Sequence, residues 1–269
     1  MTGSGYESAS ERTRRILLTA GSILVLFFLM FPILVTIPLS FSGSMFMRYP
    51  IESISLQWYE RLFEDLQWRW AILNTLIVGV SSALLAVLLG TTAAYGVYRM
   101  HSRMRGAIIA LAIMPMVVPP IVIALGSYLF FLHTGIENGY LRVIIGHTVI
   151  GIPFTVAVVY SALNSLDPTH YRAAISLGAK PFLAFRTAIL PRISRAMAGG
   201  GVLAFATSID ELIISMFVTT ARERTLPVQM FSGLREQLSP VITAAAACLL
   251  LVSALVLLLA SNRKGKTSI

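Results

Sequence analysis

Long apolar runs separated by short polar and basic segments dominate this 269-residue chain. In helical form, about 20 apolar residues cross the roughly 30 Å hydrocarbon layer of a membrane. Six runs reach that length, and we expect transmembrane helices at Ile16–Pro38, Ala71–Tyr98, Ala107–Leu132, Leu141–Leu163, Arg195–Thr219 and Val241–Ala260. The pattern therefore predicts an all-α fold, that of a polytopic membrane protein with six transmembrane helices.

The composition agrees with a chain that is solvated mainly by lipid. Only 12% of the residues are charged and 56% are hydrophobic, with a mean hydropathy of +0.79. A soluble domain carries about 25% charged residues. The single cysteine, Cys248, lies in an apolar run, which excludes a disulfide framework and a thiolate metal site.

The net charge of +9 comes from arginines and lysines placed between the apolar runs. The N-terminus, the second and fourth connections and the C-terminus together hold 14 of the 21 basic residues. Because basic loops stay on the cytoplasmic side, we expect both termini in the cytoplasm of a bacterial inner membrane. This distribution encodes topology and indicates lipid, not nucleic acid, as the surroundings. The predicted parts are a cytoplasmic segment 1–15, a transmembrane domain 16–263 and a cytoplasmic tail 264–269.

The longest connection on the basic side, about 164–195, has the signals of two short helices. The segment 167–169 places polar capping candidates around a proline, which is typical of a helix start. Gly178 suits the end of this helix, because glycine tolerates a positive φ there. Pro181 discourages continuation, and a second short helix is predicted to run to Pro191. Such a two-helix loop projects an apolar face that needs a partner to cover it.

The same loop resembles the cytoplasmic signature of ABC importer permeases. That signature reads Glu-Ala-Ala, three residues, Gly, nine residues, Ile, one residue, Leu-Pro. Two positions depart from it, since Arg172 stands in place of the glutamate and Ala188 in place of the isoleucine. The matching positions are Ala173, Ala174, Gly178, Leu190 and Pro191.

Three further segments are similar to spermidine/putrescine-type permeases: Met114–Gly126, Ala204–Thr220 and Thr225–Pro240. The resemblance covers most of the chain from about Asn74 onward. It implies a permease subunit of an ATP-driven importer that forms half of a substrate pathway for polyamines or a related small amine-containing solute. Other solutes that the resemblance leaves open are opines, phosphonates and iron.

The resemblance also implies partners: two cytoplasmic ABC ATPase subunits, a second permease subunit in a heterodimer, and an extracytoplasmic substrate-binding protein. ATP and magnesium would be bound by the ATPases, with no cofactor on this chain. In the family the loop seats in a cleft of the ATPase, and an arginine at 172 would invert the charge of one contact. The ATPase-docking residues implied are Tyr171, Arg172, Ala173, Ala174, Leu177, Gly178, Leu190 and Pro191.

Two carboxylates, Asp210 and Glu211, fall near the middle of the fifth predicted span. A charge at the bilayer centre costs about 2.5–3.5 kcal/mol on insertion scales, so it normally faces a cavity or a partner. In a continuous helix a polar stripe would line a cation pathway with Thr207, Ser208, Asp210, Glu211 and Ser215. The alternative is a structural role, in which a carboxylate bonds a nearby hydroxyl, pairs with a neighbouring helix or is protonated.

Other residues inside the predicted spans favour structural roles. Pro115, Pro119 and Pro120 must bend or open the third span, as a packing kink or a gate. His147 is interpreted as a core histidine with satisfied hydrogen bonds. The run 199–201 of glycines is assigned to close helix packing.

The sequence lacks a phosphate-binding loop, a zinc motif and a nucleophile elbow, so neither a catalytic residue nor a metal site is predicted. We therefore expect a non-catalytic transport subunit. One rival interpretation is a self-sufficient secondary transporter or channel, which usually shows internal repeats with matching broken helices. The other is an intramembrane enzyme, for which Asp210 and Glu211 alone are weak support.

Overall fold

Helices form nearly all of the computed structural model, which describes residues 9–100, 103–236 and 239–262. Within these ranges the only β pairing is an isolated bridge between Ser42 and Ile54. The predicted all-α fold class is confirmed. The first eight residues and the predicted tail 264–269 lie outside the described residues.

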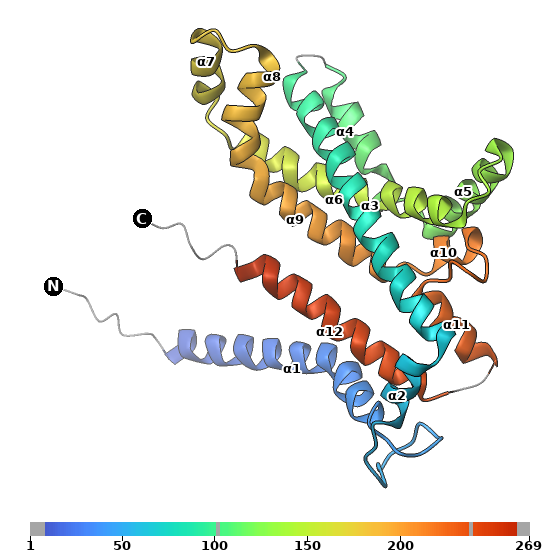
Figure 1. Ribbon diagram of the computed structural model, residues 1–269. Coiled ribbons are helices and arrows are strands. Elements are labelled where there is room, and N and C mark those ends of the chain that lie inside the picture. Colours follow the sequence, from blue (N-terminus) through green and yellow to red (C-terminus); the bar gives the residue numbers. More distant parts are fainter. Residues whose placement is uncertain (1–8, 101–102, 237–238, 263–269) are drawn as a thin grey trace.

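Three long helices pack side by side at the centre of the molecule: α3 (Leu66–Arg99), α6 (Gly139–Asn164) and α9 (Leu190–Ile209) (Figure 1). Small residues bring their backbones together, as expected for helices in lipid. A Cβ added at Gly200 would lie only 2.8 Å from the Cα of Thr155. The packing role predicted for the glycines is thus confirmed at that position.

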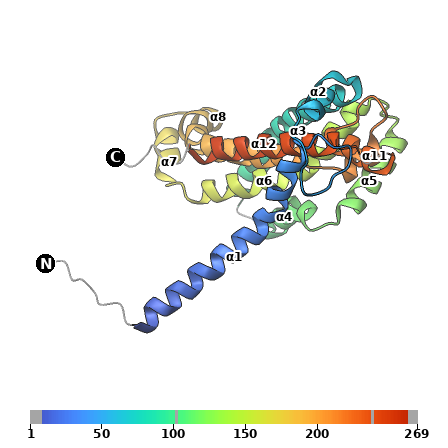
Figure 2. The ribbon, with the colours of Figure 1, turned by 90° about the horizontal axis from the view of Figure 1, so that it is seen from below.

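Helix α1 (Ala9–Leu39) extends away from this central group, and Figure 2 shows that it leaves the bundle obliquely. It contacts α12 (Val241–Asn262) near its C-terminal end. The most apolar window of Glu11–Leu39 buries none of its residues in the chain. This helix is therefore stabilised by its own hydrogen bonds and by contacts with the lipid or protein that surrounds the subunit.

A short amphipathic helix, α2 (Gln57–Glu64), precedes α3 and was not among the predicted elements. It buries Trp58 and Leu62 against α12, and the indole Nε1 of Trp58 donates to the carbonyl of Ser42 at 2.6 Å. Its wide apolar face explains why it packs on the bundle although it is too short to cross a membrane.

By length and apolarity, three described helices can cross a membrane, and a fourth if one bent pair forms a single span. The first, second and fourth predicted spans are confirmed as continuous helices. The six-span count stays a prediction. The qualifying helices are Glu11–Leu39, Leu66–Arg99 and Gly139–Asn164, and the bent pair is Arg105–Met116 with Pro120–Thr134.

The third predicted span is broken and not continuous. Helix α4 (Arg105–Ile113) passes through the 3₁₀ turn η1 (Met114–Met116) and resumes as α5 (Pro120–Thr134), bent by 96°. Pro119 has φ −54° and ψ 133°, which takes the chain out of the helical region immediately before α5. The bend predicted from the prolines is confirmed, and the continuous helix over 107–132 is wrong.

The fifth predicted span is also broken. Helix α9 ends at Ile209, and the short helix α10 (Ile213–Val218) begins after a non-helical link. Beyond the two breaks, α5 and α10 lie next to each other (Figure 1), and apolar side chains of both belong to one buried cluster. Helix α11 (Leu226–Glu236) then leads back to α12. The prediction of one helix over 195–219 is therefore wrong.

Candidate functional site

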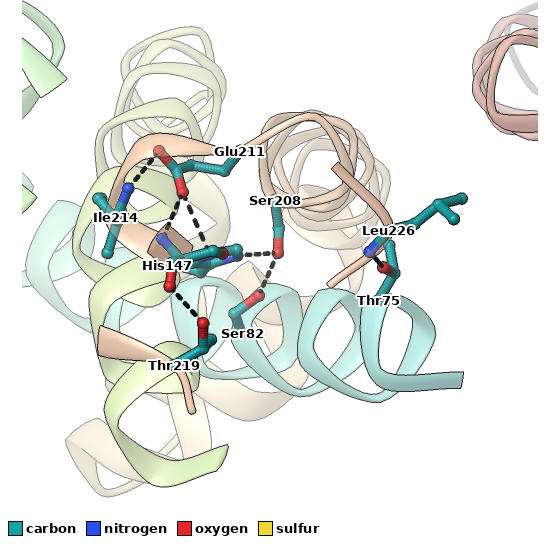
Figure 3. A network of polar contacts seen from close by, with 9 residues as sticks. Thr75, Ser82, His147, Ser208, Glu211, Ile214, Thr219 and Leu226 are labelled. Atoms are coloured by element: carbon teal, nitrogen blue, oxygen red, sulfur yellow. Dashed lines mark hydrogen bonds and ion pairs between the residues drawn. The ribbon is translucent and has the colours of Figure 1, made fainter. Parts of the chain in front are cut away.

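The link between α9 and α10 is held by the side chain of Glu211. Its Oε1 accepts a hydrogen bond from the backbone N–H of Ile214 at 2.9 Å, and its Oε2 accepts from Ser215 at 3.1 Å (Figure 3). The first backbone N–H groups of a helix lack partners within the helix, and a carboxylate there also meets the positive end of the helix dipole. Glu211, whose side chain is 8% exposed, thus caps α10.

A buried histidine of α6 joins this link to the bundle. The ring nitrogens of His147 lie 2.7 Å from the hydroxyl of Ser208 and 2.8 Å from that of Ser215, and Nε2 lies 3.4 Å from Glu211 Oε2. Ser82 of α3 donates to Ser208 at 3.0 Å. Three long helices and α10 therefore meet in one polar network (Figure 3). The interpretation of His147 as a core histidine with satisfied hydrogen bonds is confirmed.

The five residues predicted to line a pathway are divided by the break. Ser208, Glu211 and Ser215 face into the buried network. Thr207 bonds back to the carbonyl of Leu203 in its own helix. Asp210 is exposed, and its carboxylate has no hydrogen-bond or ion-pair partner among the described residues. The continuous polar stripe is therefore wrong, because a helix does not connect these positions. Their contact with substrate stays a prediction.

A second polar contact fixes the segment between α10 and α11. The amide of Asn74, on α3, donates to the carbonyls of Arg222 at 2.9 Å and Arg224 at 3.0 Å, and it accepts from the hydroxyl of Tyr140 at 2.7 Å. These residues border a cavity of about 560 Å³. Asn74 is thus the inter-helix hydrogen bonder that a polar residue in an apolar run indicates, but nothing in the local pattern pairs it with a loop 148 residues further along.

The connection 164–195 begins as predicted. Helix α7 (Thr169–Ser176) starts where Asp167 Oδ1 accepts from the backbone N–H of Thr169 at 2.9 Å. Hydrogen bonds from Thr169 hold the pKa of the Asp167 carboxyl below its ordinary value. Gly178 follows the end of α7 with φ +84°, the left-handed conformation that glycine adopts without a Cβ clash.

The second half of the loop differs from the prediction. Helix α8 (Pro181–Ala184) continues through the π-helical turn η2 (Phe185–Ile189) directly into α9. Pro191 is the second residue of α9 and does not end the helix, because η2 runs directly into α9. The predicted helix end at Pro191 is therefore wrong, and Leu190 and Pro191 belong to the start of a long helix.

The residues implied for ATPase docking differ in exposure. Leu177 is 89% exposed, and Arg172, Ala173 and Gly178 also lie on the outer surface. Tyr171 is half-buried and turns back toward α3. The outward apolar surface is extended by two residues outside the family signature, Phe182 at 74% and Leu183 at 50% exposure. The sequence could have indicated these two residues, because both are apolar and lie in a loop between predicted spans.

Comparison with known sequences identifies related transport proteins. Residues 86–262 match the family described as binding-protein-dependent transport system inner membrane component. The spermidine/putrescine transport system permease protein PotC of Escherichia coli (strain K12) is 33% identical over 87% of this chain and 88% of its own length. PotC of Haemophilus influenzae is 28% identical, with 90% of this chain and 93% of its own length covered. The putrescine transport system permease protein PotI of E. coli (strain K12) is 31% identical, with 83% and 82% covered.

Solved structures share the fold. A bacterial ABC transporter involved in the import of alginate superposes with a TM-score of 0.73 at 16% identity, covering 98% of this chain and all of that one. The alginate transporter in complex with an alginate pentasaccharide-bound periplasmic protein gives 0.70 at 20% identity with the same coverage. Together with the family match over 86–262, these findings show that the chain belongs to the binding-protein-dependent transport system inner membrane component family, as a non-catalytic, multi-pass permease subunit.

Proposed function

We propose that this chain forms half of the membrane pathway of an ATP-driven importer for polyamines or a related small amine-containing solute. The observation that carries the proposal is the 33% identity to a spermidine/putrescine permease across 87% of this chain. Two cytoplasmic ATPases, a second permease subunit and an extracytoplasmic binding protein complete the complex. ATP and magnesium are held by the ATPases.

Asp210 is the group that we assign to the cationic solute. An exposed carboxylate within an apolar segment costs about 2.5–3.5 kcal/mol unless water or a cation meets it. Asp210 has no partner among the described residues, whereas the adjacent Glu211 is occupied by α10 and His147. An ammonium group of a polyamine supplies the missing partner of Asp210. Glu211, in contrast, has a structural role, because its carboxylate is already bonded within the fold.

The exposed apolar tip of the cytoplasmic loop supports docking to an ATPase. Leu177 and Phe182 together present a surface that is unfavourable in water, and a family signature surrounds them. Arg172 is exposed beside this surface, so the partner's facing residue is expected to be acidic or neutral. A self-sufficient transporter would leave this apolar tip uncovered.

The test is uptake by the whole complex, isolated with its ATPase and reconstituted in vesicles with the binding protein. We expect ATP-dependent uptake of labelled spermidine or putrescine, with opine, phosphonate and ferric iron as comparison solutes. Uptake of one of those solutes without polyamine uptake would contradict the substrate assignment. Uptake without any bound ATPase would contradict the importer assignment.

Neutralising Asp210 tests its role separately. The Asp210→Asn variant should lose most polyamine uptake while its free energy of unfolding stays within about 0.5 kcal/mol of the wild type, because the side chain is exposed and unpaired. The matched control is Glu64→Gln, an exposed carboxylate on α2 whose replacement should leave uptake unchanged. Wild-type uptake by Asp210→Asn would exclude a cation-binding role.

A further inference from the structure

The cytoplasmic end of α3 is joined to both halves of the loop by contacts between side chains. The guanidinium Cζ of Arg99 lies 4.5 Å from the ring centroid of Tyr171 on α7. One turn earlier, the ring of Tyr95 lies 4.4 Å from that of Phe185, the first residue of η2. These four residues, which we call the α3 clamp, connect one long helix to each side of the loop.

The clamp rests on a packed apolar cluster. Ala94, Leu163 and Ile193 contribute buried side chains from α3, α6 and α9, and each is 0% exposed. The rings of Tyr95, Tyr171 and Phe185 pack against this cluster. The loop is thus held to the bundle through Tyr171 and Phe185, on either side of its exposed tip. A force on α7 reaches α3 through tightly packed atoms, which transmit strain with little compression.

The same helix reaches the two other polar sites of the molecule. Along α3, Ser82 donates to Ser208 beside the break of the fifth span, and Asn74 holds the segment at 222–224. Helix α3 has 34 residues without an interruption, so it spans about 50 Å at 1.5 Å per residue. The third and fifth predicted spans are broken and can bend at their links, whereas α3 moves as one piece.

We propose that Arg99 and Tyr171 are positioning residues for energy coupling. The α3 clamp transfers the movement of the ATPase-docked loop to α3. Helix α3 then carries this movement to the α9–α10 link and to the segment 222–224. The inference rests on the proposed docking of α7 to an ATPase. Tyr171 belongs to the docking helix, yet its ring faces Arg99. It therefore connects the bound partner to the membrane helix. A planar guanidinium over a ring retains its attraction as the two surfaces slide, which suits a contact that must persist during movement.

The experiment measures polyamine uptake and ATP hydrolysis together in vesicles containing the whole complex and its binding protein. For Arg99→Ala we expect the uptake per ATP hydrolysed to fall about fivefold or more, the range of a typical coupling effect. The ATPase should still co-purify, and hydrolysis should continue. Arg99→Lys should restore most of the ratio, because an ammonium can also lie over the Tyr171 ring. Arg103→Ala is the control, since it removes a nearby exposed arginine that has no ring partner among the described residues.

A double-mutant cycle identifies the contact itself. Tyr171→Leu keeps an apolar side chain but removes the ring, and it should lower the same ratio. Combined with Arg99→Ala it should lower the ratio no further, because residues of one contact are not additive. If Tyr171→Leu does not assemble, the Arg99 variants decide alone, since Arg99 is exposed and its loss leaves no buried group unpaired.

The outcomes are distinguishable. A wild-type ratio in Arg99→Ala, independent effects of the two substitutions, or loss of ATPase association in Arg99→Ala would each overturn the α3 clamp as a coupling contact. Failure of the proposed function would be seen before any variant is made, because the wild-type complex would then retain no ATPase or take up no polyamine.

Discussion

Two predicted spans are broken, and the causes of the two breaks differ. In the third, the break between α4 and α5 is produced by Pro115, Pro119 and Pro120, within the segment that bends. In the fifth, the link 210–212 contains neither proline nor glycine, and its geometry is held by the cap that Glu211 places on α10 and by His147 of α6. One break is built into the local backbone chemistry, and the other depends on tertiary contacts.

The difference also appears in burial. Helix α4 has no buried residue within this chain, although it lies against α6. The link in the fifth span adjoins the fully buried His147. A break imposed by proline persists in any surroundings, whereas a break imposed by packing responds to movement of the helices that supply the contacts. The α9–α10 link is therefore the break that a displacement of α3 or α6 can alter.

The largest effect is expected from removing the cap of α10. Glu211→Ala leaves two backbone N–H groups without their acceptor and removes the carboxylate beside His147, so the free energy of unfolding should fall by about 2–4 kcal/mol. Reversible unfolding in mixed micelles measures this change, with the exposed Glu64→Ala as the control. A loss below about 1 kcal/mol would mean that the Glu211 side chain does not hold the fifth-span break.

The next effect concerns His147. His147→Ala leaves the hydroxyls of Ser208 and Ser215 with fewer partners and should cost about 1–3 kcal/mol of unfolding free energy. Combined with Glu211→Ala, the loss should be smaller than the sum of the single losses by about 1 kcal/mol, because both side chains belong to one network. Additive losses would instead indicate two independent supports for the link.

The smallest effect is expected at the proline break. Pro120 is the first residue of α5, so Pro120→Ala should change stability by less than about 1 kcal/mol and leave the bend in place. Spin labels at the exposed positions Ala110 and Leu129 measure the bend. A continuous helix would separate their backbones by about 28 Å, and the bent arrangement keeps them closer. A straightened span in this single variant would show that the three prolines do not act together.

Local rules explain why much of the molecule was predictable. Apolar length placed α1, α3 and α6, and proline chemistry located the bend after α4. Gly178 marked the end of α7 because a positive φ excludes most other residues. The spacing of the loop signature indicated the family that the comparisons then showed. Each of these inferences depends on residues within one segment.

What the amino-acid sequence could not decide depends on partners distant along the chain. Asp210 and Glu211 look equivalent in a helical pattern, yet one is exposed and the other caps α10. Glu211 also lies 3.4 Å from His147 of α6, whose network partner Ser208 is 61 residues away in the chain. The sequence alone determined where the long apolar helices lie and that lipid surrounds them, because hydrophobicity and backbone propensity act locally. Only the tertiary structure decided where α9 stops and which way Tyr171 faces, because those choices depend on buried groups finding partners on other helices.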